Sequence, residues 1–176
     1  MSFVEEFGKI VIILRAPPGA GKTTFASFLR EMIKHTQITT TYVSMDAIRE
    51  SEGRKFSYTN LQEDVRKMDR MFDAAVEGGI NIIILDNTHS REWEYARKKD
   101  KAERYGYTVF LIEVQSDFWT CLRRQKHGVP FYKMQEMFDR WESPIRRGKD
   151  RIKDMEAELN NIIEAFKPST KSMESD

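Results

Sequence analysis

Short runs of apolar residues alternate along this chain with longer stretches in which apolar residues recur every three or four positions. The short runs have the length and β-branched content of strands, and they cover residues 10–14, 39–44, 80–85 and 108–114. The longer stretches have the periodicity of amphipathic helices, and they cover residues 24–34, 60–77, 90–105, 117–126, 132–141 and 150–166. This alternation predicts an α/β fold with a mostly parallel sheet of four to five strands, flanked by helices.

Local signals predict how these helices begin and which faces they bury. Residues 60–63 read Asn-Leu-Gln-Glu, the pattern of a capping box, and Ser90 and Asp117 are expected to cap the helices that follow them. We expect the first helix to turn one apolar face to the sheet, formed by Phe25, Phe28, Leu29 and Met32.

The length of 176 residues favours a single domain over residues 1–167, followed by a polar tail, 168–176, that we expect to be disordered. The apolar runs are too short to cross a membrane, and the acidic N-terminus has no signal-peptide layout. Cys121 is the only cysteine, which excludes an intrachain disulfide and favours a reducing, cytoplasmic or nuclear location.

The net charge of +1 gives the chain no overall field that would attract nucleic acid. Any such binding must therefore use local basic clusters, and the sequence has three, at residues 97–101, 123–126 and 146–151. Runs of lysine and arginine are often solvated helix faces instead, so the clusters leave both interpretations open.

The strongest chemical signal is the segment that directly follows the first apolar run. Residues 15–24 read RAPPGAGKTT, which matches the phosphate-loop pattern G-x-x-x-x-G-K-[ST] except that Ala16 replaces the first glycine. Glycines let backbone N–H groups approach a polyphosphate, and the following helix points its positive end at that charge. Lys22 can reach the β- and γ-phosphates, and the Thr23 hydroxyl can bind Mg²⁺. The pattern predicts a site for ATP, or another nucleoside triphosphate, with Mg²⁺.

The residues expected to surround the nucleotide are Pro18, Gly19, Ala20, Gly21, Lys22, Thr23 and Thr24. The alternative is a turn that merely happens to contain Lys-Thr. Ala16 would cost about 1–2 kcal/mol if its position required the left-handed region, and little if it only ends the strand.

Two acidic residues at strand ends are the next candidates. Asp46 follows the second strand, where an acceptor hydroxyl would meet the γ-phosphate, so it can act as a general base. Arg49, three residues later, would face the same cleft beyond the strand ends as Asp46. An arginine there suits a bidentate phosphate contact. The alternative is an N-capping aspartate followed by a solvated arginine.

Asp86 closes the third strand, as a metal-binding carboxylate does in phosphate-loop proteins. Thr88 follows two residues later, at the mouth of the cleft expected beyond the strand ends. Asp86 and Thr88 are therefore also candidates for binding the acceptor. Residues 122–128 read LRRQKHG, and arginines on a helix ahead of a glycine can form a lid that neutralises charge on the phosphates. A turn aspartate and a solvated basic face are the alternatives.

Together these residues resemble the polynucleotide 5′-hydroxyl kinase group of P-loop kinases, including the kinase-like domain of 2′,3′-cyclic nucleotide phosphodiesterases. The matching segments are 15–24, 46–49, 85–89 and 122–128, and the resemblance extends over residues 9–140. The group typically reads Asp-[Asp/Asn]-Thr-Asn at the third strand, where this chain ends the motif with His89.

The resemblance implies a P-loop kinase fold and a role for each motif. Lys22 and Thr23 would bind the phosphates and Mg²⁺, and Asp46 would be the catalytic base. Arg49 would hold the phosphate on the 3′ side of the acceptor nucleotide, and Arg124, with Arg123, would be the catalytic arginine of the lid. The acceptor would be the 5′-hydroxyl of RNA or DNA. A small-molecule kinase and a nucleotide-binding module with little turnover are alternatives that fold alone does not separate.

Overall fold

The computed structural model of the chain describes residues 8–34, 38–126 and 128–142. The predicted helix over residues 150–166, the predicted tail 168–176 and the basic cluster at 146–151 lie outside the described residues.

A four-stranded parallel sheet forms the centre of the described part of the chain. Its strands are β1 (Lys9–Arg15), β2 (Thr40–Ser44), β3 (Ile82–Asn87) and β4 (Tyr107–Glu113), and they lie in the order β2-β3-β1-β4. The α/β prediction is therefore confirmed. The chain leaves β1 toward one edge and β3 toward the other, so the carboxyl ends of β1 and β3 meet where ligands bind in such sheets.

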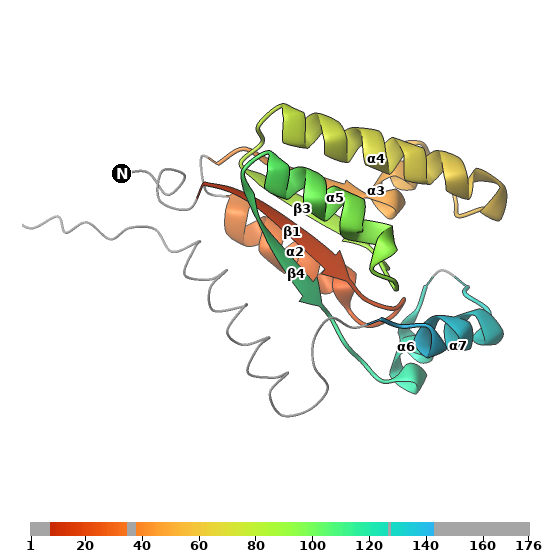
Figure 1. Cartoon of the computed structure of the whole chain (residues 1–176). Coiled ribbons are helices and arrows are strands. Elements are labelled where there is room, and N and C mark those ends of the chain that lie inside the picture. Colours follow the sequence, from red (N-terminus) through yellow and green to blue (C-terminus); the bar gives the residue numbers. More distant parts are fainter. Residues whose placement is uncertain (1–7, 35–37, 127, 143–176) are drawn as a thin grey trace, which may run out of the picture.

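Helices cover both faces of the sheet (Figure 1). One face carries α2 (Lys22–Lys34), and the other carries α3 (Met45–Ser51), α4 (Leu61–Glu77) and α5 (Trp93–Arg104). Two further helices, α6 (Phe118–Arg124) and α7 (Phe131–Asp139), lie beyond the carboxyl ends of β1 and β4.

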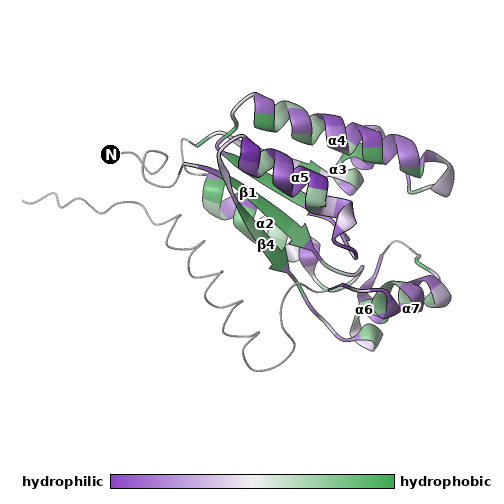
Figure 2. Ribbon diagram, in the orientation of Figure 1, coloured by the Kyte–Doolittle hydropathy of each residue, from purple (hydrophilic) through white to green (hydrophobic). Residues whose placement is uncertain are grey.

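Alternate residues of each strand enter opposite cores, as the pleat of a strand requires. In β1, Ile10, Ile12 and Leu14 pack against α2, whereas Val11 and Ile13 pack beneath α4 and α5. Both sets are buried, which explains why the strands read as nearly continuous apolar runs. Figure 2 shows this apolar sheet between helices whose outer faces are polar.

The start of β3 differs from the prediction because Ile80 belongs to the end of α4. The backbone N–H of Gly79 donates to the carbonyl of Val76 at 3.2 Å, and that of Ile80 donates to Ala75 at 3.1 Å. Gly79 has a φ of 70°. These are the two bonds of a Schellman motif, which takes Ile80 out of the sheet.

Three local predictions were wrong. Asn60 makes no capping bond, because it lies in a helical conformation at the end of a single 3₁₀ turn, Tyr58–Asn60. The Ser90 hydroxyl donates to Glu94 at 2.7 Å, and α5 begins only at Trp93.

Phe28 is 54% exposed, because the buried stripe of α2 is formed by Ala26, Leu29 and Ile33. The Asp117 cap is present, accepting from the N–H of Thr120 at 2.9 Å.

None of the described helices is both long enough and apolar enough to cross a bilayer.

Candidate nucleotide and acceptor site

The phosphate loop leaves β1 at the carboxyl edge of the sheet. Gly19 and Gly21 have φ values of 83° and 100°, a region that side chains disfavour, so both positions use the freedom of glycine. Ala16 is not among the residues with positive φ; it is fully buried, and its N–H donates to the carbonyl of Thr88 at 3.2 Å. Alanine therefore ends the strand without strain, and its departure from the usual pattern is conformationally cheap.

The loop also packs against the helix that carries the candidate lid arginines. A Cβ atom on Gly19 would lie 2.2 Å from the carbonyl oxygen of Cys121 in α6, so only glycine allows this approach. Ala16, Ala20 and Cys121 form a small buried cluster at the same contact. The base of α6 is thus held directly against the phosphate loop.

Lys22 and Asp86 are brought together where the neighbouring strands β1 and β3 end. The Lys22 ammonium forms an ion pair with Asp86, whose side chain is only 2% exposed. The hydroxyl of Tyr42 in β2 donates to the other oxygen of the same carboxylate. Burial raises the pKa of Tyr42, and the adjacent Asp86 carboxylate raises it further, so this phenol remains a donor.

Asp46 and Arg49 lie at the carboxyl end of β2, in the first and second turns of α3. Arg49 Nη1 donates to Asp46 at 2.6 Å, and Nε donates to Asp64 of α4 at 2.7 Å. Arg49 is buried, whereas the Asp46 side chain is 53% exposed. Asp46 therefore presents an accessible carboxylate whose orientation is fixed by a buried guanidinium.

Asp64 is fully buried in α4 and fixes the position of Arg49. Burial alone would raise the pKa of Asp64, but hydrogen bonds from Arg49 and Arg54 outweigh it and lower the pKa. The Phe56 ring covers the Arg49 guanidinium at 5.0 Å. Phe56 is consequently a cover for Arg49, while its neighbour Tyr58 remains exposed.

The remaining predicted residues occupy the same edge. Thr23 and Thr24 are exposed at the start of α2, and Pro18 is half-buried in the loop. Arg123 and Arg124 are exposed in the last turn of α6, with Arg123 donating to Thr120 at 3.4 Å. Thr88 is joined to the phosphate loop through its carbonyl.

His89 replaces the asparagine of the related motif and serves the backbone. It is fully buried with a φ of 47°, and Nδ1 lies 3.1 Å from the carbonyl of Leu14, to which it donates. Burial lowers the pKa of His89 to about 3, so the ring stays neutral at physiological pH. Its role at the site is to hold the turn after β3 against β1.

Sequence reasoning missed the part played by Arg15, which is the largest fully buried side chain. It donates to the carbonyls of His89 and Ser90, at 2.9 and 3.2 Å, and to that of Glu142 beyond α7. Nη1 lies 3.5 Å from Glu113, the residue paired with Arg15 in the register of β1 and β4. The signal available in the sequence was that Arg15 and Glu113, residues of opposite charge, each stand at the end of an apolar strand.

The basic cluster at residues 97–101 pairs mainly with acidic residues of the neighbouring helix. Arg97, Lys98 and Lys101 form ion pairs with acidic residues of α4, namely Asp69, Asp73 and Glu77. These ion pairs join α5 to α4 and partly neutralise the cluster, although the Arg97 side chain is 56% exposed.

The donor set suits Mg²⁺ held together with a nucleotide. Within residues 8–34, 38–126 and 128–142 there is no group of three or more His, Cys, Asp or Glu side chains that could hold a metal by itself. Mg²⁺ in nucleotide sites is usually bound by one or two protein oxygens plus the substrate phosphates. The Asp86 carboxylate and the Thr23 hydroxyl, on either side of Lys22, are such oxygens.

Comparison with curated proteins finds relatives over part of their length. The chain is 26% identical over 159 residues to human YLP motif-containing protein 1, covering 78% of this chain and 7% of that protein. It is 29% identical over 105 residues to the rat 2′,3′-cyclic-nucleotide 3′-phosphodiesterase, covering 60% of this chain and 24% of that protein. The chain therefore spans less than a quarter of the length of these relatives.

Solved structures with a similar fold include a nucleotide complex, an RNA repair complex and an APS kinase. Kti12 of Chaetomium thermophilum, in complex with ADP-AlF3, matches 90% of this chain and all of its own with a TM-score of 0.61 at 16% identity. The Pnkp1/Rnl/Hen1 RNA repair complex matches 75% of this chain and 43% of its own (TM-score 0.59, 16% identity). The Mycobacterium tuberculosis APS kinase CysC, with AMPPNP and APS, matches 89% and 98% (TM-score 0.57, 16% identity).

These likenesses show the fold, and the family is shown by a model that matches residues 11–128. That segment contains the phosphate loop, Asp46, Asp86 and α6. Since it makes up more than half of the chain, the protein belongs to the family described as AAA domain, and its domain is a kinase-like P-loop domain.

Proposed function

We propose that this protein transfers the γ-phosphoryl group of ATP to a hydroxyl, and that the acceptor is the 5′-hydroxyl of an RNA or DNA end. The observation that carries the proposal is Asp46. Its exposed carboxylate is held by buried Arg49 at the same sheet edge as the phosphate loop. A nucleotide-binding module without turnover would not need a positioned carboxylate at that place.

The first task of the site is to bind and orient the triphosphate. The backbone N–H groups of the loop around Gly19 and Gly21 and the first turn of α2 form a cradle for phosphate oxygens. Lys22 turns from Asp86 to the phosphates or shares its three protons between them. Mg²⁺ supplies charge neutralisation on the phosphates when bound, with Asp86 and Thr23 as its protein ligands.

The second task is to handle the proton of the acceptor. Asp46 accepts the hydroxyl proton as the oxygen attacks the γ-phosphorus, and Arg49 keeps the carboxylate aimed at that oxygen. Arg49 also neutralises Asp46 between turnovers, and its Nη2, which has only a weak contact with Met45 Sδ at 4.0 Å, is the donor left for the acceptor phosphate. Arg124, with Arg123, lies on a helix that contacts the phosphate loop, so it can meet negative charge on the transferring group.

The acceptor class is supported by two relatives and opposed by one. The RNA repair complex and the cyclic-nucleotide phosphodiesterase both carry nucleic-acid or nucleotide chemistry in their names. The APS kinase has the same fold and a small-molecule acceptor in its title, so a small-molecule kinase is the second candidate.

One experiment separates these candidates. The purified protein is incubated with labelled ATP, Mg²⁺ and a panel of 5′-hydroxyl oligonucleotides, nucleoside 3′-phosphates, plain nucleosides and sugars. We expect transfer to acceptors that carry a 3′-phosphate and little transfer to nucleosides or sugars. Equal use of nucleosides and 3′-phosphorylated acceptors would move the assignment to a small-molecule kinase, and absence of transfer to any acceptor would leave a binding module.

Replacing Lys22 by alanine should weaken ATP binding at least tenfold. The change removes charged hydrogen bonds to the phosphates, which contribute about 1.5–3 kcal/mol. Isothermal titration calorimetry with ATP and Mg²⁺ measures the effect. Lys34→Ala is the matched control, because Lys34 ends the same helix and pairs, among the described residues, only with Glu31 on the helix surface. An unchanged affinity in Lys22→Ala would refute the phosphate-loop assignment.

A further inference from the structure

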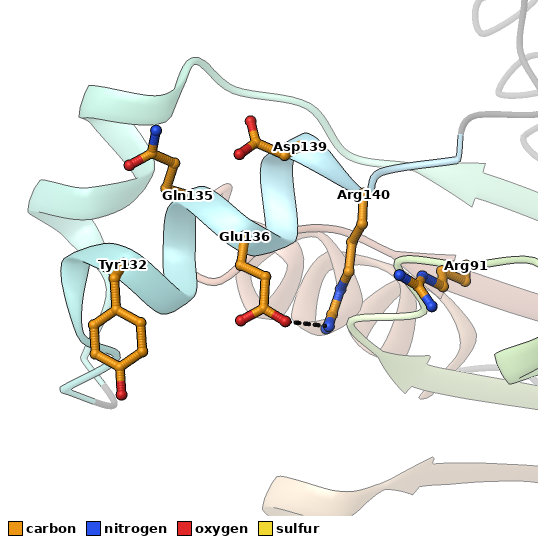
Figure 3. Close-up of a pocket in the computed structure, with 6 residues that line it drawn as sticks. All are labelled: Arg91, Tyr132, Gln135, Glu136, Asp139 and Arg140. Atoms are coloured by element: carbon orange, nitrogen blue, oxygen red, sulfur yellow. Dashed lines mark hydrogen bonds and ion pairs between the residues drawn. The ribbon is translucent and has the colours of Figure 1, made fainter.

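A pocket of about 420 Å³ lies between α7 and the turn after β3, lined by Arg91, Tyr132, Gln135, Glu136, Asp139 and Arg140. Figure 3 shows Tyr132, Glu136 and Arg140 on one side of α7 and Arg91 facing them from the turn. We propose that this pocket binds the acceptor strand, with Arg91 holding a phosphodiester and Tyr132 stacking an unpaired base. The inference rests on the proposed function and names a subsite for its substrate.

Arg91 differs from Arg15 and Arg49, the two buried arginines of the site, because its charge has no partner among the described residues. Arg15 is bonded to three carbonyls, and Arg49 is bonded to two carboxylates. The Arg91 side chain makes no hydrogen bond or ion pair with any described residue, although it is half-buried in the pocket wall. A guanidinium in a concave site that has no partner within the described part of the chain is suited to an anionic ligand.

The carboxylate of Glu136 does not cancel this charge. Lys133 donates to Glu136 at 2.9 Å and Arg140 donates to it at 3.3 Å. The pKa of Glu136 is lowered mainly by the bond from Lys133, with smaller effects of Arg140 and Arg91. Glu136 is thus already neutralised by its neighbours on α7, and Arg140 Nε is buried with no partner among the described residues.

The pocket is tied to the turn that follows Asp86. Arg91 lies five residues after Asp86, and the intervening turn is bonded to Arg15 immediately before the phosphate loop. The opposite wall is tied to the same turn, because the N–H of Glu142, just beyond α7, donates to the carbonyl of Ser90 at 2.9 Å. Both walls are therefore fixed relative to the carboxyl edge of the sheet.

The aromatic residue at the opening defines the second part of the ligand. Tyr132 is 64% exposed and lines the same pocket as Arg91. An exposed ring beside an arginine is a usual platform for single-stranded nucleic acid. Bases in a duplex are already stacked, so we infer a preference for single-stranded 5′-hydroxyl ends over blunt duplexes.

Binding in the absence of ATP tests this subsite independently of turnover. The probes are six-nucleotide single strands of RNA and of DNA with a 5′-hydroxyl and a 3′-fluorophore, and a blunt duplex, measured by fluorescence anisotropy. Arg91→Ala should weaken single-strand binding about tenfold or more and reduce its salt slope by about one. Tyr132→Ala should weaken binding to a similar extent with an unchanged salt slope, and Tyr132→Phe should retain it.

Arg104→Ala is the matched control, because Arg104 is exposed at the far end of α5 and bonded only to a backbone carbonyl. It should bind as the wild type does. Wild-type affinity in Arg91→Ala, equal affinity for the blunt duplex, or absence of single-strand binding by the wild type would each overturn the inference. Single-strand binding that depends on Arg91 without any transfer would instead support the subsite and reject the proposed reaction.

Discussion

Asp46→Asn should lower kcat for the acceptor by about 10²–10⁴-fold, the usual effect of losing a general base. Asparagine keeps the shape of the side chain and can still accept a bond from Arg49, so the local structure should survive. It offers no carboxylate to take the proton, however. ATP affinity should stay within a few-fold of the wild type, because Asp46 lies at the end of β2, away from the loop that contains Lys22.

The measurement is steady-state transfer of labelled phosphate, with ATP affinity determined by calorimetry on the same preparations. Glu50→Gln is the matched control, since Glu50 is an exposed acid on the same helix and should turn over normally. Wild-type turnover in the Asp46→Asn protein would place the base elsewhere. A loss of ATP affinity equal to the loss of rate would instead make Asp46 part of the nucleotide site.

The elements that position this site were predictable from sequence because their signals are local. Buried parallel strands read as apolar runs, and the order strand, glycine loop and helix around Lys22 requires no long-range information. Asp46 and Asp86 were found because each follows such a strand. Strand order then brings Asp86 beside the phosphate loop, since β3 pairs directly with β1.

The partners of these residues were not predictable in the same way, because they depend on how distant elements pack. Tyr42 binds Asp86 only because β2 lies beside β3, and its sequence context is that of an ordinary strand residue. Asp64 precedes Met68 and Phe72 at helical spacing, so its place on the buried face of α4 could have been inferred. Its partners, Arg49 and Arg54, could not, because they come from α3 and the loop after it.

The buried ion pairs change how the motif arginines are understood. Arg49 was predicted to hold an acceptor phosphate, and the structure shows two of its three nitrogen atoms, Nη1 and Nε, bonded to Asp46 and Asp64. The third, Nη2, has only a weak contact with Met45 Sδ at 4.0 Å, so a direct phosphate contact by Arg49 remains a prediction. Arg91, which no motif identified, has no such bonds to described residues. Arg49→Ala and Arg91→Ala should therefore differ in their effect on acceptor binding.

Arg15→Met should produce the largest loss of stability of any substitution at the site, about 3–5 kcal/mol. The substitution keeps most of the side-chain volume. It leaves the carbonyls of His89, Ser90 and Glu142 without their buried donor, and each such loss costs about 1–3 kcal/mol. It also removes the contacts of the guanidinium with the rings of Tyr95 and Trp141, at 5.2 and 4.9 Å.

Chemical denaturation measures this loss, with Arg104→Met as the control, because removal of an exposed arginine should change the free energy of unfolding by about 0.5 kcal/mol or less. Hydrogen exchange then shows where stability is lost. Arg15 ties the segment after α7 to the turn after β3, so protection in α7 should fall more than protection in α4. Equal losses of protection in α7 and α4 would mean that Arg15 stabilises the sheet as a whole and does not specifically hold α7 at the carboxyl edge of the sheet.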